Sequence, residues 1–147
     1  MSTDESVTKD LISILEDGKD GFAKGADKLE GDDRGDLAAK FRTWSAQRER
    51  FAGELRSMAK AYGDNIHESG SVAGALHRGW LSLKDALTGN DPNGVLDAAE
   101  QGEDHAVAAY DKALKDDISM ELRAVVERQY TDVKAAHDDV KRLRNTN

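Results

Sequence analysis

The amino-acid sequence predicts an all-α protein, and three observations support this fold class. The 147 residues include one proline, the residue that most strongly interrupts a helix. Long segments are rich in Ala, Leu, Glu, Lys and Asp rather than in the β-branched and aromatic residues that strands favour. Hydrophobic residues recur at intervals of three and four, the period of one helix face. We predict one domain over residues 1–147, a length that can bury a single core.

The first two long helices are predicted at about residues 6–29 and 34–62. A short turn of sequence EGDD separates them, so we expect them to be antiparallel neighbours. Glu16, Asp17 and Asp20 fall outside the hydrophobic stripe of the first helix and are expected in solvent. The stripe of the second helix contains Leu37, Phe41, Trp44, Arg48, Phe51, Leu55, Met58 and Tyr62.

The last two long helices are predicted at about residues 92–115 and 119–144. Asp91 and Pro92 have the residue types that favour the start of a helix, and Ser119 is a second candidate cap. The inner stripe of the last helix contains Leu122, Val126, Gln129, Tyr130, Val133, Ala136, His137 and Val140.

The connection between the two pairs of helices is long and contains a further predicted helix at about residues 72–87. Ser71 precedes this segment and Gly89 follows it, as expected of helix caps. Two antiparallel hairpins joined by a long crossover are the connectivity of a ferritin-like four-helix bundle. We therefore predict that architecture.

Several segments resemble a known family. They are SGSVAGALHRGWLSLKDALTG, the GED of the third long helix, and the VERQY and AHDDVKRLR of the fourth. This pattern resembles a bacterial family of uncharacterised four-helix-bundle proteins, a domain of unknown function in the ferritin-like superfamily. The resemblance implies a ferritin-like fold in a bacterial cytoplasmic protein linked to stress response, without an established biochemical activity.

One carboxylate lies on an otherwise apolar helix face. Glu103 shares its face with Ala99, Ala106, Tyr110 and Ala113. A buried carboxylate needs a cation, hydrogen-bond donors or a metal, because its isolated charge is costly to bury.

Arg48, on the inner stripe of the second helix, is a candidate partner for Glu103. We predict a buried polar network of Arg48, Glu103, Gln129, Tyr130 and Tyr110, with Gly18 leaving space for the guanidinium.

A metal centre is the alternative. Ferritin-like di-metal sites use a Glu from each of two helices and a Glu-x-x-His pair from each of the others. Here only Glu103 conforms, because the fourth helix has Glu127-x-x-Tyr130 and His137 lies on the order of 9 Å beyond Glu103 along the bundle. We expect no metal or other cofactor, the alternative being iron or manganese bound by Glu103, His137, Glu127 and Asp17.

Composition restricts the function classes. A net charge of −8 disfavours nucleic acid and anionic membranes as partners, and no apolar run reaches the roughly 20 residues of a membrane span. The sequence has no cysteine and no recognisable nucleophile motif, so an enzyme is the less favoured interpretation. The start lacks the features of a signal peptide, and we expect a cytoplasmic protein. Its expected mode of action is association with itself or with another protein, for which the exposed side of the crossover helix near Leu81 is the first candidate surface.

Overall fold

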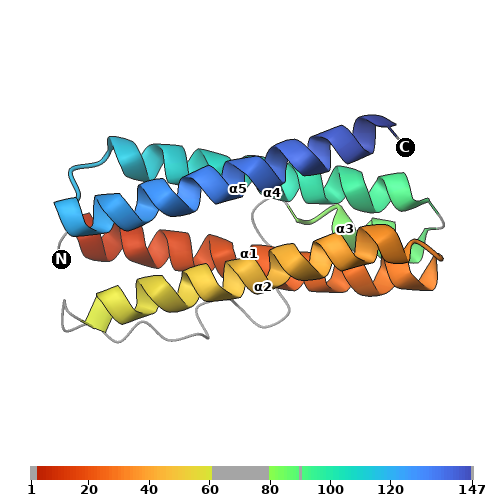
Figure 1. Ribbon diagram of the computed structural model, residues 1–147, viewed down its shortest axis with the longest axis horizontal. Coiled ribbons are helices and arrows are strands. Elements are labelled where there is room, and N and C mark those ends of the chain that lie inside the picture. Colours follow the sequence, from red (N-terminus) through yellow and green to blue (C-terminus); the bar gives the residue numbers. More distant parts are fainter. Residues whose placement is uncertain (1–2, 61–79, 90, 147) are drawn as a thin grey trace.

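The computed structural model describes residues 3–60, 80–89 and 91–146. These ranges contain five helices and no strand, which confirms the all-α prediction (Figure 1). The helices are α1 (Thr3–Gly31), α2 (Gly35–Lys60), α3 (Leu83–Thr88), α4 (Pro92–Lys115) and α5 (Met120–Thr146).

The four long helices lie side by side with their axes roughly aligned (Figure 1). α1 packs against α2 and α4, and α4 packs against α5. α1 and α5 run in one direction and α2 and α4 run in the other, so α2 ends at the opposite end of the bundle from the start of α4 (Figure 1). The predicted ranges of the long helices agree with the observed ones within about three residues where the structure describes both ends.

Local hydrogen bonds explain several helix ends. The side chain of Asp91 accepts a hydrogen bond from Asn93 N at 2.9 Å, and Pro92 is the first residue of α4. Ser119 Oγ accepts one from Leu122 N at 3.2 Å. Both predicted caps are therefore confirmed. In addition, Asp4 Oδ1 accepts a hydrogen bond from Ser119 N at 2.8 Å, which connects the start of α1 to the turn between α4 and α5.

The crossover helix differs from its prediction at about residues 72–87. Residues 72–79, with the proposed cap Ser71 just before them, lie outside the described residues. Trp80 to Ser82 form a turn, closed by a hydrogen bond from Leu83 N to Trp80 O at 3.0 Å, and α3 begins only at Leu83. Within the described residues, the prediction is therefore wrong for residues 80–82 and holds from Leu83 to Leu87. Gly89 is the C-cap of α3, as predicted.

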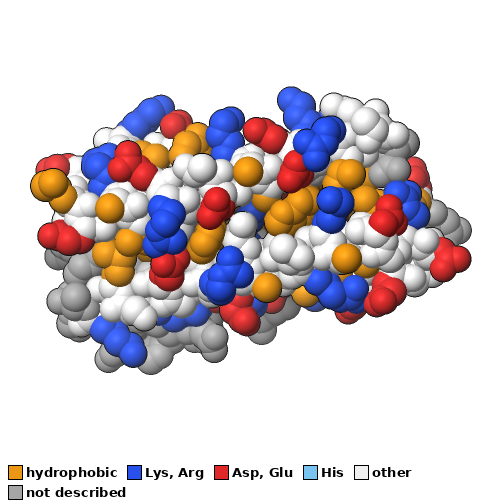
Figure 2. All heavy atoms as spheres, in the orientation of Figure 1, with side chains coloured by type: hydrophobic (Ala, Val, Ile, Leu, Met, Phe, Trp, Pro, Cys, Tyr) orange, Lys and Arg blue, Asp and Glu red, His pale blue; other side chains and the backbone are white. Residues whose placement is uncertain are grey.

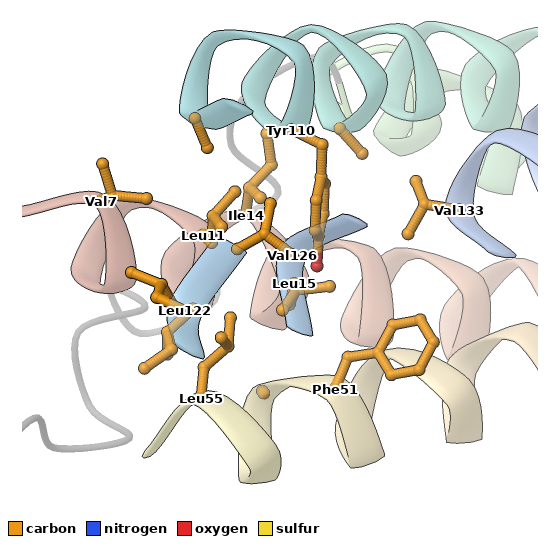
Figure 3. Close-up of a cluster of buried hydrophobic side chains, with 14 of the residues drawn as sticks. Val7, Leu11, Ile14, Leu15, Phe51, Leu55, Tyr110, Leu122, Val126 and Val133 are labelled. Atoms are coloured by element: carbon orange, nitrogen blue, oxygen red, sulfur yellow. The ribbon is translucent and has the colours of Figure 1, made fainter. Parts of the chain in front are cut away.

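The hydrophobic core consists of two clusters, one toward each end of the bundle. Figure 3 shows the cluster that includes Leu11, Leu15 and Tyr110. The other cluster includes the aromatic residues Phe22, Phe41, Trp44 and Trp80. The interval between the clusters holds the four buried charged residues of the described ranges, namely Glu16, Asp17, Arg48 and Glu103.

The expectation that Glu16 and Asp17 lie in solvent is wrong. Their exposed fractions are 4% and 1%. α1 contacts α2, α3 and α4, so more of its circumference is covered than a single hydrophobic stripe indicates. Glu16 is compensated by Arg56 Nη2, 2.5 Å from its Oε1, and by Lys19 Nζ, 3.0 Å from its Oε2.

The surface carries both signs of charge. Figure 2 shows acidic and basic side chains interspersed over the face it presents, with hydrophobic side chains between them. Leu81, the candidate contact residue of the crossover, is 73% exposed. Within the described ranges, every helix is too short or too polar to cross a membrane.

Candidate functional site: a buried ion pair at mid-height

Arg48 of α2 and Glu103 of α4 meet in the interval between the two hydrophobic clusters. Nη1 of Arg48 donates to Oε2 of Glu103 at 2.5 Å, and Nη2 donates to Oε1 at 2.6 Å. The residues are 1% and 0% exposed. The contact is therefore a bidentate, charge-assisted pair that water does not screen.

The guanidinium of Arg48 has two further neighbours. Its Nε donates to Oε1 of Gln47 at 3.2 Å, and its Cζ lies 5.3 Å from the ring centroid of Phe22, within the range of a cation–π interaction. Gly18 faces it from α1, and a Cβ added there would lie 3.4 Å from Nη1. Because that is an ordinary van der Waals distance, the arginine does not require a glycine at this position.

Burial and pairing act on Arg48 in opposite directions. Burial alone would lower the pKa of Arg48, but the charge of Glu103 and its hydrogen bonds outweigh this and raise the pKa. Arg48 therefore stays protonated in the core. Removal of either partner would leave a buried charge uncompensated, which typically costs about 3–5 kcal/mol.

A second buried polar group forms around Gln129. Tyr110 OH donates to Oε1 of Gln129 at 2.7 Å, and Nε2 of Gln129 donates to Phe51 O at 3.2 Å and to Oε1 of Glu54 at 3.1 Å. Burial raises the pKa of the Tyr110 phenol, so it remains a hydrogen-bond donor. Tyr130 contributes a stacked ring, 6.3 Å from that of Tyr110.

The five predicted network residues thus form two groups. One is the ion pair, and the other is the hydrogen bond between Tyr110 and Gln129 with Tyr130 packed beside it. Sequence periodicity placed these side chains on inward faces, but it could not show which of them share hydrogen bonds.

Comparison with known protein families gives one match. A family model described as Domain of unknown function (DUF2383) matches residues 5–116, about three quarters of the sequence. The chain belongs to this family. No match was found among curated proteins. The DUF2383 match includes Arg48 and Glu103 and ends at the residue after α4.

Among the described residues, those considered for a metal do not form one site in this DUF2383 chain, although His137 contacts Asp104, the residue that follows Glu103. Glu103 is engaged by Arg48, Glu127 is exposed, and Asp17 is buried in α1. His137 contacts two other acids, Asp104 Oδ1 at 2.6 Å through Nε2 and Asp138 Oδ1 at 3.1 Å through Nδ1. Across the described ranges, no three His, Asp or Glu side chains converge so as to hold an ion.

Sequence reasoning missed several polar partners in the DUF2383 chain. Asp104 is exposed and accepts from His137. Glu54, which is partly exposed, accepts both from Gln129 and from Arg128, whose Nη2 lies 2.6 Å from its Oε2. Long side chains such as these reach sideways from a helix flank, so the period of the hydrophobic stripe does not reveal their contacts.

Proposed function

We propose that this DUF2383 protein is a non-catalytic ferritin-like bundle that acts through association with itself or with another protein. In this proposal the pair of Arg48 and Glu103 stands where related bundles hold two metal ions. The observation that carries it is the bidentate contact, in which both oxygens of the one inward glutamate are engaged. The link to stress response rests on the family resemblance.

The electrostatics of the pair support this proposal. A metal at mid-height would have to displace the guanidinium from Glu103, because both carboxylate oxygens already accept hydrogen bonds. The displaced cation would stay buried next to the ion and repel it. The same cation neutralises Glu103 without a metal, so this pair is electrically balanced as it stands.

The pair also offers a structural role. It joins α2 to α4, helices that belong to different hairpins, and it requires one relative position of the two helices along the bundle. A buried polar pair of this kind can specify register more than it adds stability. A bundle held in one register presents a constant outer surface, which a protein acting by association requires.

Elemental analysis of the chain purified without chelators, together with light scattering, tests the proposal. Elemental analysis should find well below one iron or manganese ion per chain. Light scattering should find a particle larger than the monomer, formed either by copies of the chain or by the chain with another protein. About two tightly held ions per chain, lost in Glu103→Gln and retained in the matched control Glu49→Gln, would favour the metal-binding alternative instead. Glu49 is a suitable control because it is an exposed glutamate of the bundle and is not one of the candidate metal ligands.

A further inference from the structure

We draw no further inference here: the strongest candidate, the cavity of about 230 Å³ between the start of α1 and the end of α4, with apolar walls that include Val7, Leu11 and Ala113 and charged residues at its rim, carries none because nothing in the described part of the chain shows what covers it.

Discussion

Replacement of Glu103 by glutamine tests the central ion pair most directly. The substitution preserves the size of the side chain but removes the charge that compensates Arg48. An amide can accept one hydrogen bond from the guanidinium, but its NH2 group then faces a second donor in place of the oxygen that accepts at 2.5 or 2.6 Å in the native pair. The result is a buried cation without its counter-charge.

The magnitude follows from burial. Both side chains are almost completely inaccessible to water, with exposed fractions of 1% and 0%, so the loss should approach the roughly 3–5 kcal/mol expected when one member of a buried pair is removed. For a domain of this size each kcal/mol lowers the melting temperature by roughly 2–4 °C, so we expect a decrease of about 6–20 °C.

Urea and thermal unfolding, followed by circular dichroism at neutral pH, provide the measurement. Glu127→Gln is the control for loss of a surface charge, and it should change stability by less than about 0.5 kcal/mol. The double variant Arg48→Met with Glu103→Leu should recover much of the loss, because an apolar pair leaves no charge stranded. If Glu103→Gln melts at the same temperature as the wild type, the reasoning is refuted. It is also refuted if the double variant loses as much stability as Arg48→Met and Glu103→Leu lose in sum.

Three further predictions concern the surroundings of the pair. Gly18→Ala should stabilise the chain by up to about 1 kcal/mol, since the added Cβ fits at 3.4 Å from the guanidinium and the helix gains propensity. Tyr110→Phe should cost about 1–3 kcal/mol in urea unfolding, because Gln129 loses its buried donor. His137 has a raised pKa in the fold, since hydrogen bonds to Asp104 and Asp138 outweigh its burial. Its contribution is therefore present below about pH 6.5, the unfolded value, and is lost as pH rises through the folded pKa. The change should be under about 1 kcal/mol, because Asp104 is 62% exposed, and His137→Gln should abolish it.

Each of these predictions has a result that would contradict it. A loss of stability in Gly18→Ala would mean that the guanidinium cannot tolerate a neighbouring methyl group. An unchanged Tyr110→Phe would show that Gln129 finds another donor. The free energy of unfolding should be compared from about pH 6 to about pH 9, a range that begins near the ordinary pKa of histidine. If it decreases as much in His137→Gln as in the wild type, His137 is not the cause of the pH dependence.

Periodicity and cap chemistry alone determined the long helices, because both depend on residues close together in the chain. The hydrophobic repeat predicted four long helices, and Asp91, Pro92 and Ser119 marked two of their starts. The same repeat placed Arg48 and Glu103 on inward faces. The hydrophobic spacing and the capping side chains both act between residues that are within one or two helical turns of each other.

Only the tertiary structure decided which distant side chains meet. The sequence suggested Arg48 as the partner of Glu103, but the bidentate geometry of that pair depends on how the helices are rotated and aligned against one another. The separate hydrogen bond of Tyr110 to Gln129 and the burial of Asp17 depend on the same alignment. The role of Gly102 was equally inaccessible, since its missing side chain is explained by the indole of Trp80. A one-dimensional repeat reports which face of a helix is inward, but it carries no information about what the neighbouring helix places opposite that face.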